Sequence, residues 1–240
     1  MTSTSVRIRL TLSGFALVLA AAMLATATAR AQAKQYALES AAGLRLHNVS
    51  AVAAELQGRK GIRLTVAPQA GSAPADAEQL AVIEGIEFAS GLIEAEIAGQ
   101  PAPGAPEGAR GFVGIAFRVQ PDLKTYDAFY LRPTNGRADD QERRNHSLQY
   151  ISHPDWPWFR LRKETPGRYE SYADLVPGAW TKVKIEVSGE RARLYVHDQE
   201  QPSLIVNDVK SGAQGKGGIA LWLGPGTVAH ARNLTVTAQK

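Results

Sequence analysis

Beyond residue 33, apolar and polar side chains alternate with a period of two along most of the chain. In residues 181–187, Thr, Val, Ile and Val occupy the odd positions, and Lys182, Lys184 and Glu186 lie between them. Such alternation is typical of strands with one buried and one solvated face, as in antiparallel sheets. Turn signals rich in glycine separate the alternating segments. The sequence therefore predicts an all-β fold, in which roughly a dozen antiparallel strands form a two-sheet sandwich.

Residues 1–33 differ from this pattern and have the order of a secretory signal peptide. Two arginines precede an apolar run from Leu10 to Leu24, and Ala31-Gln32-Ala33 supplies the small residues of a cleavage site. The apolar run is shorter than the roughly 20 residues that a membrane span needs. We therefore expect cleavage before Lys34, no membrane span, and a product in the periplasm or outside the cell.

The charge and size of residues 34–240 limit what this part of the chain is. It holds 24 of the 27 basic residues and all 23 acidic residues, which gives a formal net charge of +1. This near balance argues against a nucleic-acid partner, because nucleic-acid binding needs a basic stripe. The absence of cysteine from the sequence excludes disulfides, a thiol nucleophile and a thiolate metal site. At this length we expect one domain, with the Pro- and Gly-rich residues 99–111 as a long hairpin loop.

Residues 126–174 differ from the rest of the chain and hold most of the side chains that suit a binding site. A strand at 126–133 is followed by the polar residues 134–146, which contain one alanine and no larger apolar side chain. A polar loop beside clustered aromatic residues often forms a binding site on a rigid scaffold, although its charges fit an exposed ion network equally well. The candidate ligand-binding residues are Arg118, Tyr130, Arg132, Asn135, His146, Gln149, Trp156 and Trp158.

Trp156 and Trp158 allow two interpretations, because tryptophans either plug the end of a sandwich or offer a flat surface to a ligand. If residues 156–159 are extended, both indole rings point to one side and Phe159 points to the other. On that assumption the tryptophans form the binding platform and Phe159 belongs to the core. We then expect Phe159→Ala to destabilise the protein more than either tryptophan-to-alanine change.

Six segments of the chain carry a family resemblance, mostly through core and turn positions. They are residues 88–97, 111–118, 180–189, 192–196, 218–222 and 233–236. These segments resemble concanavalin A-like lectin/glucanase domains, in particular the laminin-G-like and 3-keto-disaccharide-hydrolase-type domains of bacterial exported proteins. The resemblance extends over essentially all of residues 34–240. It implies a jelly roll with a concave sheet, on which relatives commonly bind or cleave carbohydrate.

The resemblance transfers no catalytic residue to this chain. Family 16 glycoside hydrolases carry a strand with Glu-x-Asp and a further Glu, whereas here Glu94-Ala95-Glu96 lacks the third carboxylate. The disaccharide-hydrolase type has a Glu-x-Gln strand, where this chain has Tyr126-Asp127-Ala128. Glu94 and Glu96 remain the catalytic candidates, because residues i and i+2 of a strand share a face at about 6.6 Å, which suits a glycosidase pair. Their alternative role is that of solvated side chains on a wet face.

Three functions follow from these observations. The first is an exported sandwich that recognises a glycan or a similar polyhydroxylated ligand, with Tyr130, Trp156 and Trp158 as apolar surfaces and polar neighbours as hydrogen-bond partners. The second is a glycoside hydrolase or a related carbohydrate-active enzyme that uses the same cleft, which convergence of Glu94, Asp127 and Tyr130 in one cleft would favour. The third is an adhesive sandwich that binds another protein through a flat apolar patch.

The sequence indicates no cofactor. Calcium is common in related sandwiches, but the sequence contains no Asp-x-Asp-x-Asp-Gly loop. His146 and His153 lack a spaced ligand partner in the sequence, which argues against a metal triad and leaves the metal content open.

Overall fold

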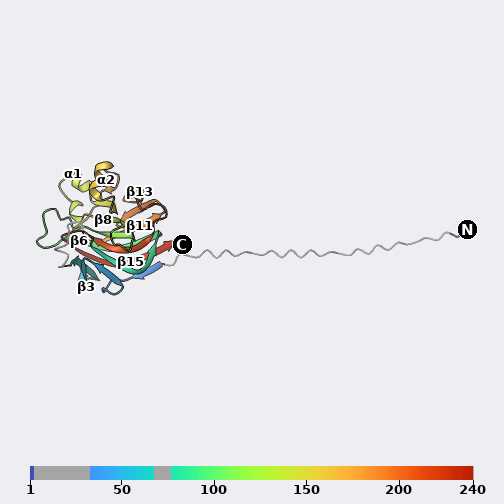
Figure 1. Ribbon diagram of the computed structural model, residues 1–240, viewed down its shortest axis with the longest axis horizontal. Helices are drawn as coiled ribbons and strands as arrows, with labels where there is room; N and C mark the ends of the chain where they lie inside the picture. Colours follow the sequence, from blue (N-terminus) through green and yellow to red (C-terminus); the bar gives the residue numbers. More distant parts are fainter. Residues whose placement is uncertain (3–32, 68–76, 240) are drawn as a thin grey trace. The chain divides into compact units, whose positions relative to one another are not determined.

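The computed structural model shows two antiparallel β-sheets packed face to face, and it describes residues 1, 2, 33–67 and 77–239 (Figure 1). The predicted all-β sandwich is confirmed. Nearly all of the expected leader lies outside the described residues, and the first strand, β1, begins at Ala33. None of the helices in the described ranges has the length and apolar character of a membrane span.

The larger sheet has eight strands, in the order β13-β12-β11-β6-β15-β4-β3, with β1 beside the second half of β15. β15 (Thr227–Gln239) pairs with β6 on one side, and on the other side with β4 through residues 228–231 and with β1 through residues 234–237. The other strands are β1 (Ala33–Tyr36), β3 (Val49–Leu56), β4 (Arg59–Val66), β6 (Ser90–Pro101), β11 (Thr181–Ser188), β12 (Arg191–Val196) and β13 (Leu204–Val206).

The smaller sheet has seven strands, in the order β10-β9-β8-β7-β14-β5-β2. Its strands are β2 (Leu44–His47), β5 (Leu80–Phe88), β7 (Val113–Val119), β8 (Tyr126–Leu131), β9 (Leu148–His153), β10 (Glu170–Ser171) and β14 (Gly217–Leu223). Every residue of β7 and β8 is buried. Because only one face of this sheet packs against the larger sheet, side chains and connecting segments must cover the outer face as well.

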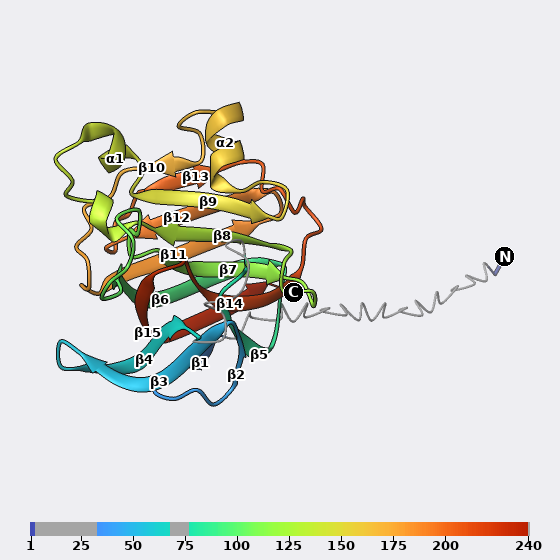
Figure 2. The same cartoon turned by 60° about the vertical axis from the view of Figure 1, so that its left-hand side comes forward.

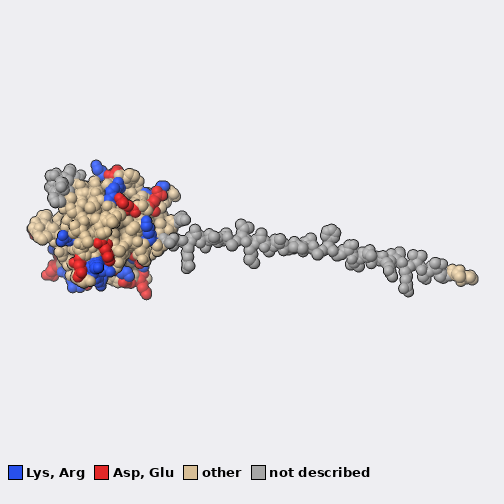
Figure 3. All heavy atoms as spheres, turned by 90° about the horizontal axis from the view of Figure 1, so that it is seen from below, with Lys and Arg blue, Asp and Glu red and all other residues tan. Residues whose placement is uncertain are grey.

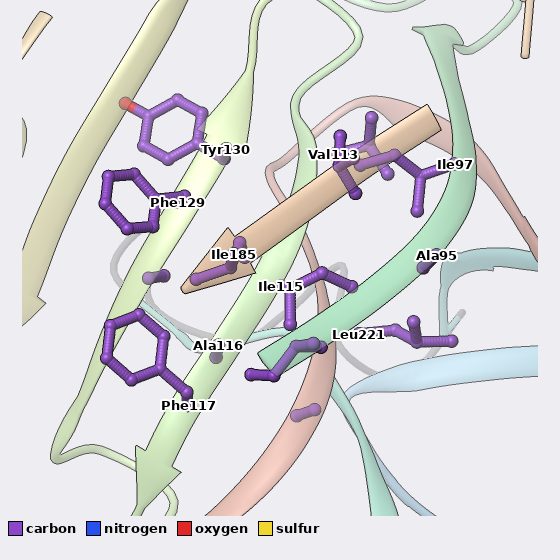
Figure 4. Packing of buried hydrophobic residues seen from close by; sticks show 14 of the residues in the cluster. Ala95, Ile97, Val113, Ile115, Ala116, Phe117, Phe129, Tyr130, Ile185 and Leu221 are labelled. Carbon is purple, nitrogen blue, oxygen red and sulfur yellow. The ribbon is translucent and has the colours of Figure 1, made fainter. Parts of the chain in front are cut away.

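The core lies between the sheets, where inward side chains of both sheets meet (Figure 4). Ile97 and Ile185 of the larger sheet and Ile115 of the smaller one are each almost fully buried. In β11 the buried positions alternate with exposed or half-buried ones, as the sequence predicts. Full burial of such a side chain stabilises the fold by about 1.5–3 kcal/mol, so this alternation fixes which face of each strand turns inward.

The predicted hairpin over residues 99–111 is wrong. β6 pairs with β11 and β15 in the larger sheet, whereas β7 pairs with β8 and β14 in the smaller sheet. The segment therefore crosses from one sheet to the other. Both strands have an apolar face, and these faces pack against each other across the core instead of pairing edge to edge.

Short helices occupy segments that the sequence analysis treats as loop or extended chain. The polar residues 134–146 include most of the 3-10 helix η2 (Pro133–Asn135) and the helix α1 (Gln141–Asn145), whose N-terminus is capped by Asp140. A second helix, α2 (Trp158–Glu164), follows β9. Both α-helices lie near the β9–β10 edge of the smaller sheet (Figure 2). The assumption that residues 156–159 are extended is therefore wrong.

Candidate functional site

The outer face of the smaller sheet, which points away from the larger sheet, is lined by polar and aromatic side chains. Register places Trp222, Gly114, Tyr130 and Gln149 side by side across β14, β7, β8 and β9. The rings of Trp222 and Tyr130 stack with their centroids 4.7 Å apart. Gly114 lies between them and has no side chain, which leaves room for this contact.

At the β9–β10 edge of this face, three charged or titratable side chains surround Glu170, and together with it we call them the Glu170 cluster. Arg132 Nη1 donates to Glu170 Oε1 at 3.1 Å, and Arg162 donates from Nε at 3.0 Å and also from Nη2. His146 Nδ1 lies 3.0 Å from Glu170 Oε2. Arg132 and Glu170 are almost fully buried, so these charges are compensated by each other rather than by water.

Arg132 ties the predicted binding residues together. Its Nη2 donates to Tyr130 Oη at 2.8 Å and to Gln149 Oε1 at 3.0 Å, and its Nη1 donates to the carbonyl of His146 at 3.0 Å. The same carbonyl accepts from Asn135 Nδ2 at 3.2 Å. The structure thus brings together Tyr130 of β8, Asn135 of η2, Gln149 of β9, and Arg132 and His146, which directly follow β8 and α1.

Burial shifts the pKa values of Glu170 and His146, and the neighbouring charges shift them further or oppose the effect. Burial raises the pKa of Glu170, but the hydrogen bonds from Arg162 and the charges of Arg132, Arg162 and His146 outweigh it, so the pKa of Glu170 lies below its ordinary value. Burial lowers the pKa of His146. The charge of Glu170 opposes this decrease, and the charges of Arg162 and Arg132 add to it. At neutral pH the cluster therefore holds a carboxylate, two guanidinium groups and a neutral imidazole, and it carries a surplus positive charge.

Trp158 is the accessible aromatic side chain over this cluster. Its ring lies 4.8 Å from the Arg162 guanidinium and 5.8 Å from that of Arg132, both in cation–π geometry. The residue is 43% exposed, and the Arg162 side chain is 33% exposed. A ligand at this edge therefore meets an indole face and a guanidinium side by side.

A second group of polar side chains, the His153 cluster, lies on the same outer face. Glu78, which precedes β5, accepts from Tyr126 Oη, and its Oε1 lies 2.6 Å from His153 Nδ1. Trp222 Nε1 donates to Tyr126 Oη at 3.0 Å. The imidazole of His153 stacks on the Tyr126 ring at 5.2 Å. Small neighbours on this face, Ala116 and Ala128, are fully buried.

Two of the predicted binding residues lie apart from these clusters. Arg118 has a left-handed backbone conformation (φ 57°) and is buried, where it donates to the carbonyls of Ala89, Gly189 and Gly212 and to Ser211 Oγ. Its donors are thus taken up by turns at one end of the sandwich. Trp156 is half-buried, and the cations of Arg160 and Lys210 lie over its ring at 4.0 and 4.7 Å.

Phe159 is exposed rather than part of the core. It is 60% exposed, and within α2 the buried residue is Leu161. The helix turns Phe159 outward next to Trp158, with the two rings 5.9 Å apart. The assignment of Phe159 to the core is therefore wrong, because it depended on an extended backbone.

The carboxylates considered for catalysis do not converge with the aromatic residues. Glu94 and Glu96 lie on β6 of the larger sheet, with their side chains on its outer surface. Glu96 is paired with Arg59 at 2.6 Å, and Glu94 lines a shallow hollow with Lys182 and Tyr195. Asp127 points into the molecule and accepts from Tyr150 Oη at 2.6 Å. Glu94, Asp127 and Tyr130 therefore do not meet in one cleft, which is the arrangement that would favour a hydrolase.

The residues that sequence reasoning missed are Glu78, Arg162, Glu170 and Trp222. Glu170 stands between Tyr169 and Ser171 in the sequence, and it becomes notable only because β10 pairs it with Gln149. Arg162 is positioned by a helix that has one buried residue and hence no apolar periodicity. Only Trp222 could have been recognised from the sequence pattern, because it lies between two buried leucines of β14 and so points to the opposite face.

In the ranges that the structure describes, no group of three or more His, Cys, Asp or Glu side chains is placed to hold a metal ion. The Glu170 cluster contains two arginines around one carboxylate, a donor set that repels a cation rather than binding one. Figure 3 shows basic and acidic side chains interspersed on one face of the molecule.

No protein-family model matches this chain, and no curated protein matches it. Among solved structures, a protein of unknown function with a galectin-like fold from Bacillus subtilis superposes with a TM-score of 0.51 at 11% identity, over 85% of this chain and 94% of that one. The carbohydrate-binding module CBM66 from Bacillus subtilis gives 0.49 at 12% identity, over 80% and 97%. A β-glucanase from Bacillus licheniformis gives 0.43 at 12% identity, over 86% and 98%.

At these identities the likeness shows the fold alone. Together with the two antiparallel sheets, the galectin-like structure confirms the predicted jelly-roll sandwich of the concanavalin A-like type.

Proposed function

We propose that this protein binds carbohydrate on the outer face of its smaller sheet, at the Glu170 cluster. The observation that carries this proposal is the position of Trp158, which exposes its ring directly above two guanidinium groups. Sugars present apolar C–H faces and polar hydroxyl edges. An aromatic ring beside fixed hydrogen-bond donors fits both of these surfaces.

The network beneath Trp158 supports the proposal because it preorganises the donors. Arg132 is held by Glu170, Tyr130 and Gln149, so it does not move on binding. Arg162 is held by two hydrogen bonds to Glu170 while part of its side chain remains exposed. A binding site whose donors are already ordered loses less conformational entropy when a ligand arrives.

The positions of the carboxylates favour recognition over glycoside hydrolysis at this site. Hydrolysis requires two carboxyl groups flanking the same bond, one of them protonated. Glu170 is buried and its pKa is lowered, so it is a poor proton donor. Glu94 and Glu96 lie on the other sheet.

The proposal extends to the location of the protein. The order of charges and apolar residues in residues 1–33 supports export, with the folded part acting in the periplasm or outside the cell. Such a location places a glycan-binding sandwich next to cell-surface or environmental polysaccharides. N-terminal sequencing of the exported protein tests this point, and a start near Met1 would contradict it.

A glycan array probed with the protein tests the binding proposal. The wild type should bind at least one glycan, and Trp158→Ala should weaken that binding tenfold or more, because exposed aromatic anchors in such sites carry much of the affinity. The matched control is Ile205→Ala, which removes an exposed apolar side chain from β13 of the other sheet. Equal binding by the two variants, or no bound glycan for the wild type, would contradict the proposal.

A further inference from the structure

The His153 cluster has an arrangement that the proposed binding function does not require. Glu78 Oε1 lies 2.6 Å from His153 Nδ1, and the other carboxylate oxygen accepts from Tyr126 Oη. Asn48 Nδ2 donates to the backbone carbonyl of Glu78 at 2.9 Å, which holds the segment before β5 in place. Two side-chain contacts and one backbone contact thus fix the carboxylate against the imidazole.

This contact determines which nitrogen of His153 is available. With Nδ1 donating to Glu78, the lone pair of the imidazole is on Nε2. Among the described residues Nε2 has no hydrogen-bond partner, and the side chain is 22% exposed. The imidazole is therefore oriented by a carboxylate, stacked on Tyr126 and open to solvent at its basic nitrogen.

The phenol of Tyr126 is a hydrogen-bond donor to the Glu78 carboxylate. Burial, followed by the nearby charge of Glu78, raises the pKa of Tyr126 well above its ordinary value, so the phenol stays protonated and donates to Glu78. Trp222 Nε1 in turn donates to the same phenol oxygen. A carboxylate fixed in this way stabilises the imidazolium that forms when Nε2 takes a proton.

We infer that His153 is the general base of a hydrolytic site that removes an acyl group ester-linked to a saccharide. The inference rests on the proposed function for its saccharide, since the His153 cluster and Trp158 share the outer face of one sheet. Glu78 is the positioning residue, because it acts through His153. The ligand class is an O-acylated carbohydrate, with acetyl as the simplest acyl group.

The reaction balances with water as the second reactant. His153 Nε2 takes a proton from a water molecule while the water oxygen forms a bond to the ester carbonyl carbon. The bond between that carbon and the sugar oxygen then breaks, and the proton on Nε2 passes to the departing sugar oxygen. The products are a carboxylic acid and a free sugar hydroxyl, and His153 returns to its neutral form.

The choice of an ester over a glycosidic bond follows from the available groups. Glycosidic cleavage needs a protonated carboxyl group next to the leaving oxygen and a second carboxylate nearby. In the His153 cluster the one carboxylate, Glu78, is occupied by Tyr126 and His153. An imidazole base that first accepts and then returns one proton suffices for ester hydrolysis.

The test measures acetate release from p-nitrophenyl acetate and from acetylated xylan by the full protein. The wild type should turn over both substrates, and His153→Gln should lower the rate at least about 100-fold, as expected for loss of a general base. Glu78→Gln should lower kcat about tenfold with little change in KM, since it disturbs orientation rather than binding. The matched control is His197→Gln, which should leave the rate unchanged. His197 is an exposed histidine that is hydrogen-bonded to the Asp174 carbonyl.

A second variant distinguishes loss of the base from misfolding of the protein. His153→Ala should be inactive, and added imidazole should restore part of its activity, which a merely misfolded protein would not show. A wild-type rate no higher than that of His153→Gln overturns the inference, and so does an absence of imidazole rescue. If the glycan array still shows binding that depends on Trp158, the proposed function stands while the hydrolytic inference fails.

Discussion

Tyr130 and Trp222 stack face to face at 4.7 Å although the strand β7 runs between their own strands. The contact is possible because β7 places Gly114 between them. Tyr130 receives a hydrogen bond from Arg132 of the Glu170 cluster, and Trp222 donates one to Tyr126 of the His153 cluster. The stack is therefore the physical link between the two clusters on the outer face.

Gly114→Ala should break this link. A Cβ at this position would lie 2.5 Å from Tyr130 Cβ and 2.3 Å from the carbonyl oxygen of Phe129, so β7 and β8 must separate. We expect a loss of about 1–3 kcal/mol in the free energy of unfolding, as for overpacking, measured by urea melts. Gly218→Ala is the control, because its Cβ would have no atom closer than 3.6 Å. Equal stability of the two variants would show that the strands separate easily.

Arg118→Met should destabilise the sandwich without a direct effect on glycan binding. The change leaves half-buried acceptors at Ala89, Gly189 and Gly212 without their donor, and each unsatisfied group costs about 1–3 kcal/mol. We expect a total loss of about 3 kcal/mol or more in chemical denaturation. Arg63→Met, at an exposed position of β4, should change stability by less than about 0.5 kcal/mol. A fully stable Arg118→Met protein with lost binding would instead assign Arg118 to the site.

Glu170→Gln should destabilise the protein in a pH-dependent manner. At pH 7 the change leaves buried Arg132 without its counter-charge, which costs about 3–5 kcal/mol. The folded-state pKa of Glu170 lies below the unfolded value of about 4.3. Its stabilising effect is therefore fully present above that value and is lost as the pH falls through the folded-state pKa.

Urea melts of Glu170→Gln and the wild type between pH 3 and pH 7 check this prediction. The difference between the two proteins should shrink below about pH 4. Glu164→Gln is the control, because its pair with Arg160 is exposed and contributes less than about 1 kcal/mol. A difference that stays constant down to pH 3 would mean that folding does not shift the pKa of Glu170.

Within α2, Leu161→Ala and Phe159→Ala should have very different effects. Leu161 is buried, so truncation should cost about 2–5 kcal/mol. Phe159 is 60% exposed, and its truncation should cost less than about 1 kcal/mol. Thermal or urea melts of both variants decide the point. If Phe159→Ala melts below Leu161→Ala, the helix is turned the other way and the exposed aromatic surface is misassigned.

The fold was predictable because its signal is local. Alternation in segments such as residues 181–187 depends only on which side chains face the core, and β11 follows it position by position. The route of the chain between strands was less predictable. Residues 99–111 carry the composition of a turn, and nothing local distinguishes a turn within one sheet from a crossover between two.

The candidate site was predictable in part, and for a different reason. Tyr130, Arg132, Gln149 and Trp158 were found because polar and aromatic residues concentrate in one stretch of sequence. Glu170 and Glu78 were missed because they lie outside the stretch of sequence that holds the other site residues. A single glutamate there has no distinguishing pattern, since glutamates are common on protein surfaces. Arg118 was misleading, since a positive φ turns its side chain away from the face that strict alternation assigns to it.

The central place of β15 in the larger sheet has a consequence for when this fold forms. Without residues 227–239, β4 and β3 have no bonded connection to β6, β1 loses its partner strand, and the larger sheet falls into three separate pieces. A nascent chain that has not yet produced this strand therefore cannot complete the sandwich. Completion of the larger sheet therefore waits until residue 239 has been synthesised, so the last strand to be made is the one that joins its parts.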